Sequence, residues 1–172
     1  MSSPLETYKI YIAADHAGFS MKRALAEGLR ARGYAVVDMG AHAFDSEDDY
    51  PEYVTPCAMR VAEVRTQGDT HAFGVVIGGS GQGEAMAANR VRGARAAVFY
   101  GGARAKGTLD AEGAQAQDAL DIVRLARAHN DANILSLGAR FLTDAEALAA
   151  VELFLRTPFS GAAHHARRIA AF

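Results

Sequence analysis

Short apolar runs alternate with longer amphipathic stretches along the chain, a pattern typical of α/β proteins with a parallel sheet. The apolar runs are continuous and do not alternate with polar residues, as expected for strands buried on both faces. The runs predicted as strands are Tyr8–Ala14, Ala35–Met39, Ala72–Ile77, Ala94–Tyr100 and Asn133–Leu137.

Amphipathic helices are predicted between the strands and after the last one. Met21, Leu25 and Leu29 recur at every fourth residue, which places them on one buried helix face. Thr143 and Glu146 have the spacing of a capping box at a helix start. The predicted helices are Gly18–Ala31, Tyr53–Val64, Gly83–Asn89, Leu109–His129, Asp144–Leu155 and a last one from about Gly161.

We expect residues 1–172 to form one domain, because the chain has no internal repeat and no linker with a shift in composition. Residues 101–119, rich in Gly, Ala and Gln, interrupt the compact pattern after the fourth strand. They are interpreted either as a surface loop that leads into a longer helix or as a lid over a pocket. The second reading follows from the position of such loops beside the ligand crevice of open α/β sheets.

Composition narrows the possible classes of protein. Half of the 172 residues are hydrophobic and the formal net charge is only -2, which indicates neither nucleic-acid binding nor binding to a membrane surface. No apolar run approaches the roughly 20 residues that span a bilayer, and Met1–Thr7 does not resemble a signal peptide. The single cysteine, Cys57, allows no internal disulfide. We therefore expect a cytoplasmic protein in which Cys57 is an unreactive core thiol.

Polar residues follow several of the predicted strands, where parallel α/β sheets bind small ligands. Asp15-His16 follows the first strand, the loop 78–84 follows the third, and Arg140 follows the fifth. His129-Asn130 ends the predicted helix before the fifth strand. We expect all of these groups to meet at one edge of the sheet.

The loop Gly78-Gly79-Ser80-Gly81-Gln82-Gly83 is the most distinctive of these segments. Its glycines permit positive φ and let backbone N–H groups approach an oxyanion or a phosphate at a helix N-terminus. The loop lacks the Lys-Ser/Thr ending of a P-loop and the glycine spacing of a dinucleotide site. Taken alone it is equally compatible with a tight structural turn. Glu84 could likewise be an ordinary first-turn carboxylate, and His129 a charge at a helix C-terminus.

Short motifs around these residues occur in order along the chain. They are Asp15-His16-Ala17-Gly18-Phe19, Asp49-Tyr50-Pro51, Gly79-Ser80-Gly81-Gln82-Gly83-Glu84, Ala87-Ala88-Asn89, Gly93-Ala94-Arg95, His129-Asn130-Asp131 with Asn133, Gly138-Ala139-Arg140, and His165 with Arg168. In combination they resemble the RpiB/LacA/LacB sugar-phosphate isomerases over essentially the whole chain apart from residues 101–119.

The resemblance implies a Rossmann-like, three-layer α/β sandwich with a five-stranded parallel sheet. It also implies a homodimer with active sites between subunits, and leaves open whether two dimers pair into a tetramer. The reaction would be an aldose–ketose isomerisation through a cis-enediolate, with no metal and no cofactor. The leading substrate pair is ribose 5-phosphate and ribulose 5-phosphate, as in the pentose phosphate pathway.

The resemblance also indicates the catalytic base. One branch of the family uses a Cys just before the glycine turn, where this chain has Gly78, whereas the mycobacterial-type branch uses a Glu after the turn, where this chain has Glu84. Partial burial would raise the pKa of that carboxyl, so that it could remove and return a proton. By the same resemblance, Ser80 and the N–H groups of Gly79, Gly81 and Gly83 would stabilise the enediolate oxygen.

Further roles follow from the same resemblance. His129 would open the sugar ring, because imidazole titrates near neutral pH. The sugar hydroxyls would be held by Asp15 and Asn130. The residues expected to bind the phosphate or to shape that end of the pocket are His16, Arg140, His164, His165 and Arg168. His129, Asn130 and Arg140 are expected to act on the glycine loop of the partner subunit.

One departure from the family pattern leaves the substrate open. His164 stands where relatives often have an Arg, and His is only partly charged at pH 7. Arg104 and Lys106 in the inserted segment could restore a phosphate contact or belong to a solvated loop. The alternatives are allose 6-phosphate, galactose 6-phosphate, a tetrose phosphate, a non-phosphorylated sugar, or a non-catalytic sugar-phosphate-binding protein. A flavodoxin-like nucleotide module is disfavoured, because Asp15-His16 occupies the place of its phosphate loop.

Overall fold

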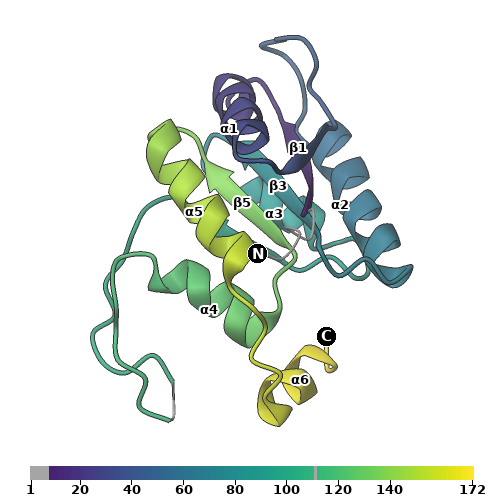
Figure 1. Cartoon of the computed structure of the whole chain (residues 1–172). Helices are drawn as coiled ribbons and strands as arrows, with labels where there is room; N and C mark the ends of the chain where they lie inside the picture. Colours follow the sequence, from purple (N-terminus) through teal and green to yellow (C-terminus); the bar gives the residue numbers. More distant parts are fainter. Residues whose placement is uncertain (1–7, 111) are drawn as a thin grey trace.

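The computed structural model describes residues 8–110 and 112–172. It contains one parallel five-stranded sheet, with the strand order β2-β1-β3-β5-β4, between two layers of helices (Figure 1). The strands are β1 (Lys9–Ala14), β2 (Ala35–Asp38), β3 (Ala72–Gly78), β4 (Ala96–Phe99) and β5 (Ile134–Gly138). The helices are α1 (Phe19–Ala31), α2 (Pro51–Thr66), α3 (Gln82–Ala88), α4 (Asp121–Asn130), α5 (Asp144–Arg156) and α6 (Ala163–Ile169). The predicted α/β sandwich is confirmed. The expectation for Met1–Thr7 lies outside the described residues.

The apolar core has two halves, one on each face of the sheet. Ile10 and Ile12 of β1 pack with residues of α1, α4 and α5, whereas Tyr11 and Ala13 of the same strand pack with residues of α2 and α3. Successive side chains of a strand point to opposite faces, so a strand covered on both sides must be apolar at every position. This is why the strands could be predicted from continuous apolar runs.

Several local predictions are confirmed. Met21, Leu25 and Leu29 are buried on α1. Thr143 and Glu146 form the capping box of α5, in which the Thr143 N–H donates to Glu146 Oε2 at 2.8 Å. Cys57 is fully buried inside α2, and its Sγ lies 3.4 Å from the carbonyl oxygen of Tyr11. Burial raises the pKa of the Cys57 thiol to about 12, so the thiol is unreactive at neutral pH.

The predicted helix Leu109–His129 is wrong at its start. The helix begins only at Asp121, and residues before it form turns, with Gly113 at a φ of 86°. Asp118 Oδ1 accepts the N–H of Leu120 at 2.8 Å, and Asp121 Oδ2 accepts the N–H of Gln117 at 2.8 Å. Both hydrogen bonds hold the residues before the helix in turns, as Asp side chains do when they accept nearby backbone N–H groups. The alanine-rich residues 112–120 therefore lie outside the helix, although alanine favours helices.

The two ends of the parallel strands face different parts of the molecule. The carboxyl ends of the strands lie near the start of α1, and α6 lies at the opposite end of the molecule (Figure 1). The segment 101–119 leaves the end of β4 and runs past α4 toward the end where α6 lies. Among the described helices, none has both the length and the apolar character needed to cross a membrane.

Candidate active site

A cavity of about 360 Å³ opens at the carboxyl edge of the sheet. It is formed by the segments that follow β1, β3 and β5, together with Tyr50 at the end of the loop that leads into α2. Its lining residues are Asp15, His16, Ala17, Tyr50, Gly79, Ser80, Gly83, Glu84, Arg140 and Phe141. The structure thus brings together seven of the predicted site residues: Asp15, His16, Gly79, Ser80, Gly83, Glu84 and Arg140.

The glycine loop owes its shape to two of its glycines. Gly81 has a φ of 76° at the N-cap of α3, a conformation that residues with a Cβ rarely adopt. Its carbonyl oxygen accepts the Ser136 hydroxyl at 2.6 Å, while the residue itself does not line the cavity. Gly83 lies beneath Tyr50, whose hydroxyl would be 2.6 Å from a Cβ at this position. Gly81 therefore turns the chain, and Gly79, Ser80 and Gly83 face the cavity.

Glu84 lies in the first turn of α3 and is only 4% exposed. Burial raises the pKa of the Glu84 carboxyl, and the negative charge of Asp15 adds to this effect. The N–H groups of Gly81 and of Glu84 itself act in the opposite direction, and the net pKa shift is upward. A cavity-facing carboxylate with a raised pKa holds a removed proton more readily than an ordinary carboxylate, as a general base must.

Asp15 is buried and shapes the turn that leads into α1. Its Oδ1 accepts the N–H of Ala17 at 3.0 Å and the N–H of Gly18 at 3.2 Å. Gly18 is needed there because a Cβ would lie 2.5 Å from the carbonyl oxygen of Ile77 in β3. One carboxylate oxygen of Asp15 is thus committed to the backbone, which leaves Oδ2 for a ligand.

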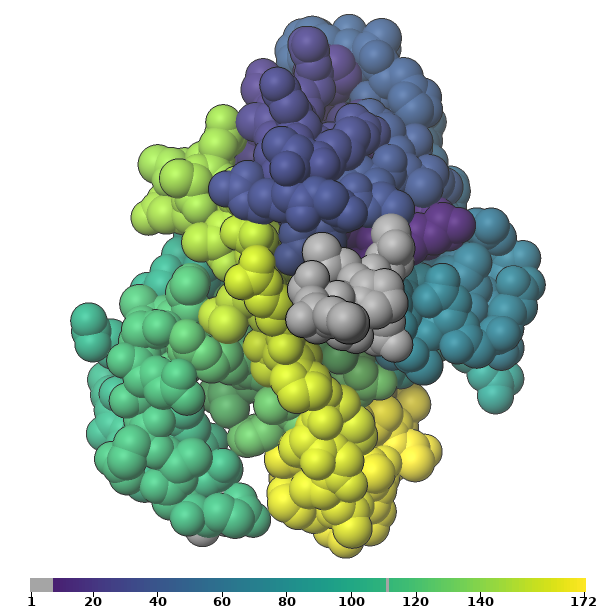
Figure 2. All heavy atoms as spheres, viewed as in Figure 1, coloured from purple at the N-terminus to yellow at the C-terminus, as the bar shows by residue number. Residues whose placement is uncertain are grey.

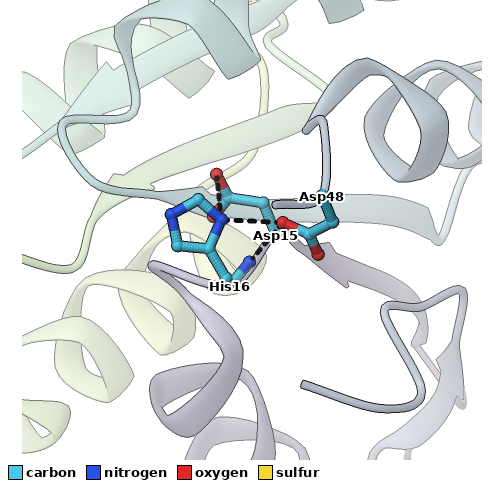
Figure 3. Close-up of side chains that lie close together, drawn as sticks. All are labelled: Asp15, His16 and Asp48. Atoms are coloured by element: carbon cyan, nitrogen blue, oxygen red, sulfur yellow. Dashed lines mark hydrogen bonds and ion pairs between the residues drawn. The ribbon is translucent and has the colours of Figure 1, made fainter. Parts of the chain in front are cut away.

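His16 is held by Asp48, a residue that the sequence analysis did not single out. Asp48 Oδ1 accepts both the backbone N–H of His16 at 3.0 Å and its ring Nδ1–H at 2.7 Å (Figure 3). The hydrogen bond to Asp48 raises the pKa of His16, although burial and Arg140 oppose it. The two residues are 32 positions apart in the sequence, so no local pattern predicts their contact. The one related signal is the run of acidic residues before Tyr50.

Donor atoms of Asp15, His16 and Asp48 all lie within 4.8 Å of one another, a spacing at which a metal ion could also be held. In this structure His16 Nδ1 and Asp48 Oδ1 are bonded to each other, and Asp15 Oδ1 is bonded to backbone N–H groups. We therefore interpret the cluster as a hydrogen-bonded network and assign no metal to it.

Arg140 lies over the glycine loop of its own chain. Its backbone N–H donates to the carbonyl oxygen of Gly79 at 3.1 Å, and its Cζ would be 3.2 Å from a Cβ at Gly79. The expectation that Arg140 reaches the partner's glycine loop is therefore corrected: this side chain faces the cavity of its own subunit. The hydrogen bond from Arg140 to Gly79 joins the end of β5 to the loop after β3.

A second cavity, of about 320 Å³, lies near α6 at the other end of the molecule. Figure 2 shows the surface hollowed between the segment 101–119 and α6. The His129 ring stacks on His165 with centroids 4.1 Å apart, and the His164 ring lies 4.0 Å from His165. Burial lowers the pKa of His165, and the neighbouring positive groups lower it further. The lining residues are Leu109, Asp110, Glu112, His129, His164, His165 and Arg168.

The prediction that His129-Asn130 meets Glu84 at the carboxyl edge is therefore wrong for a single chain. The helix before a parallel strand runs against the strand direction, so it ends at the amino edge of the sheet. Asn130 lies apart from both cavities, in a groove of about 800 Å³ beside residues 91–98 and Phe172.

The inserted segment does not cover the Glu84 cavity of its own chain. Leu109, Asp110 and Glu112 instead line the second cavity. Arg104 and Lys106 are exposed and line neither of these two cavities. Within one chain the segment is thus a border of the histidine-rich cavity.

Comparisons with known proteins agree with this geometry. The family model described as Ribose/Galactose Isomerase matches residues 10–117 and 111–172. The chain is 38% identical to ribose-5-phosphate isomerase B of Mycobacterium leprae over 161 residues, which is 94% of this chain and 85% of the relative.

Solved structures give the same result. The structure of ribose-5-phosphate isomerase B from Mycoplasma genitalium with bound ribulose 5-phosphate has a TM-score of 0.76 and 35% identity, covering 95% of this chain and 92% of that one. The enzyme of Anaplasma phagocytophilum has a TM-score of 0.78 and 29% identity, covering 98% of this chain and 99% of that one.

Proposed function

The chain belongs to the ribose/galactose isomerase family, and from this membership we propose that it interconverts ribose 5-phosphate and ribulose 5-phosphate with Glu84 as the base. The observation that carries the proposal is the buried Glu84 carboxyl with its raised pKa, facing a cavity that also contains Ser80 and Asp15. The relatives named ribose-5-phosphate isomerase B support the choice of substrate.

The chemistry is a proton transfer between neighbouring carbons. Glu84 removes the proton from C2 of the open-chain aldose, and the electrons of that C–H bond move to give an enediolate. The resulting carboxylic acid returns the proton to C1, and a proton moves from O2 to O1, which yields the ketose. A carboxyl whose pKa is raised toward the working pH can act in both directions.

The developing negative charge on the substrate oxygen requires donors that are already in position. Ser80 and the N–H groups of Gly79 and Gly83 line the cavity and are the donors that we propose. Gly81 keeps the loop in its left-handed turn. Proton transfers alone complete the reaction, so we propose no metal and no cofactor. The lone buried thiol of Cys57 fits a reducing, cytoplasmic compartment.

We propose that the complete site forms between two copies of the chain. The Glu84 cavity contains the base but not His129, and the cavity near α6 contains three histidines and no carboxylate other than Asp110 and Glu112 of the insertion. In a two-fold dimer each contact occurs twice, so His129 of one subunit can serve the Glu84 cavity of the other. There it would open the sugar ring, and Asn130 would hold a hydroxyl.

The phosphate end of the substrate would then be shared between subunits. His16 and Arg140 belong to the subunit that carries the base, and His164, His165 and Arg168 to its partner. Because the pKa of His165 is lowered, Arg168 is the permanent positive charge on the partner's side. A permanently charged guanidinium is well suited to a phosphate group.

The test is turnover of ribose 5-phosphate in buffer with EDTA, comparing the wild type with Glu84→Gln. We expect a loss of about 10²-fold or more in kcat, because Gln retains the shape of the side chain but cannot take a proton. If the wild type instead converts a four- or six-carbon sugar phosphate, the proposed substrate is wrong and the assignment of Glu84 as the base stands. If Glu84→Gln is as fast as the wild type, Glu84 is not the base.

A further inference from the structure

Two hydrogen bonds from one carboxylate oxygen fix the position of His16. Asp48 Oδ1 accepts the His16 backbone N–H at 3.0 Å and the ring Nδ1 at 2.7 Å. The Asp48 side chain is only 3% exposed, whereas that of His16 is 32% exposed and lines the cavity. The ring therefore has one nitrogen tied to the protein, and Nε2 lies on the side of the ring away from both carboxylates (Figure 3).

The charge on the ring decides what Nε2 can bind. When the ring is neutral and Nδ1 carries its proton, Nε2 is an acceptor and repels an anionic oxygen. When the ring is an imidazolium, Nε2–H is a donor and forms a charge-assisted hydrogen bond to such an oxygen.

We propose that Asp48 is a positioning residue that holds His16 as a doubly protonated ring, with Nε2–H directed at the anionic phosphate end of the substrate beside Arg140. This inference rests on the proposed sugar-phosphate substrate. It assigns to Asp48 a role in substrate affinity, exerted through His16, and no contact with the reacting carbons.

The charged groups around His16 support this assignment. Asp48 lies on the loop that precedes α2, Asp15 Oδ2 is 4.0 Å from His16 Nδ1, and Arg140 faces His16 from the segment after β5. Both carboxylates favour the charged ring, and Arg140 disfavours it. The hydrogen bond to Asp48 is the largest of these influences on the pKa of His16. Removing the charge of Asp48 should therefore lower the pKa of His16 more than removing the charge of Asp15.

The remaining neighbours of Asp48 leave His16 as its main partner. Its second oxygen, Oδ2, is buried and accepts no hydrogen bond from the described residues. Tyr53 of α2 faces Asp48, and its pKa is raised by burial and by the charge of that carboxylate. Asp48→Asn keeps an oxygen that can accept the His16 backbone N–H and removes the charge, which makes it the probe of the charge.

The experiment compares Asp48→Asn with Asp49→Asn, the same chemical change at the adjacent, exposed position. The first readout is the NMR titration of the His16 ring in the free protein, assigned by its loss in His16→Gln. The second is kcat and KM for ribose 5-phosphate between pH 6 and 9. The third is Asp48→Asn in the His16→Gln background, and Asp48→Glu, which keeps the charge, serves as the rescue variant.

For Asp48→Asn we expect the His16 titration to move to lower pH. KM at pH 8 should rise about tenfold, the lower end of the value of a hydrogen bond to a charged group. At pH 6 the KM difference should narrow, because a larger fraction of the His16 rings is then protonated in Asp48→Asn, and kcat should change less than about twofold. Asp49→Asn should match the wild type, and Asp48→Asn should add nothing in the His16→Gln background.

Three results would overturn the inference: an unchanged His16 titration, a KM penalty that is the same at pH 6 and pH 8, or a further KM penalty in the His16→Gln background. Failure of the proposed function is a separate outcome, in which the wild type converts no sugar phosphate. The inference is then decided without turnover, by titrating inorganic phosphate. It stands if phosphate shifts the His16 resonances at lower concentration in the wild type than in Asp48→Asn, and it falls if the two proteins respond alike.

Discussion

The Glu84 carboxylate occupies the volume that a side chain at Gly78 would fill, since a Cβ built on Gly78 overlaps both the carboxylate carbon and its oxygens. Gly78 ends β3, and Glu84 follows six residues later, in the first turn of α3. The two positions therefore share one space at the cavity wall, and only one of them can carry a side chain. The absence of a side chain at position 78 is thus part of how the base is held.

The first prediction concerns this shared space. Gly78→Ala should displace the Glu84 carboxylate and reduce kcat for ribose 5-phosphate by about 10²-fold, because small displacements of reacting groups have large effects on rate. It should also lower the free energy of unfolding by about 1–3 kcal/mol through overpacking. Steady-state kinetics and urea unfolding measure the two effects. Gly107→Ala is the control, since a Cβ there meets open space. A wild-type kcat in Gly78→Ala would show that a side chain at position 78 does not disturb the Glu84 carboxylate.

The second prediction concerns the acidic limb of the pH–rate profile. Glu84 must be deprotonated to act as a base, so kcat/KM should fall as the pH falls through the raised pKa of Glu84, above the ordinary value of 4.5. Asp15→Asn removes a negative charge that raises this pKa, and the limb should move to lower pH. The position of the limb is the readout, because Asp15 is also expected to bind substrate. An unmoved limb would mean that Asp15 does not influence the base.

The third prediction follows from the same burial and concerns stability. A carboxyl whose pKa is raised by folding destabilises the native state at pH values above that raised pKa, where the native state carries a buried charge. Glu84→Gln should therefore raise Tm at pH 8, on the order of 2 °C, and the gain should disappear at pH 4, where both side chains are neutral. Differential scanning calorimetry at the two pH values measures this. A gain that is equal at both pH values would be independent of the charge.

The fourth prediction concerns the loop that carries Asp48. The buried Lys22 of α1 donates to Asp38 Oδ1 at 2.6 Å and to the carbonyl oxygen of Ala41 at 2.6 Å, which ties the start of this loop to the helix. Because Asp38 is about a third exposed, water can replace part of the pair, and Lys22→Met should cost about 2 kcal/mol of unfolding free energy. Chemical denaturation measures the loss, with the exposed Arg23→Met as control. Equal stability of the two variants would show that the buried lysine contributes nothing.

The strands and the glycine loop could be predicted from the sequence because their signals are local. Continuous apolar runs mark strands covered on both faces, and a cluster of glycines before a carboxylate marks a turn into a helix. The start of α4 could not be predicted, because Asp118 and Asp121 accept the backbone N–H groups of Leu120 and Gln117 and hold the alanine-rich stretch before the helix in turns.

Two features of the site could not be predicted from local sequence patterns. Asp48 meets His16 only because the loop before α2 folds back over the end of β1, and no periodicity reports such a contact. His129 lies at the amino edge of the sheet because α4 runs against the strands, and the order of elements along the sequence does not show this direction. Directions of helices, and not only their neighbours in sequence, decide which side chains share a cavity.

The last prediction tests whether the site needs two subunits. Glu84→Gln and His129→Ala homodimers should each be nearly inactive toward ribose 5-phosphate, the first lacking the base and the second the group that opens the ring. In a mixed dimer, the Glu84 cavity of the His129→Ala subunit faces His129 of the Glu84→Gln subunit. One of its two sites is therefore intact. Random mixing gives about half mixed dimers, so co-refolding should restore about a quarter of wild-type activity.

Two differently tagged chains make the mixed dimer separable, and its activity should be about half that of the wild-type dimer. Co-refolding of Glu84→Gln with Ser80→Ala serves as the control, because both residues line the same cavity and every mixed dimer then has one defect in each site. No recovery in the first mixture would show that Glu84 and His129 do not cooperate across the interface. Recovery in the control mixture as well would show that Glu84 and Ser80 serve different sites, against their shared cavity within one chain.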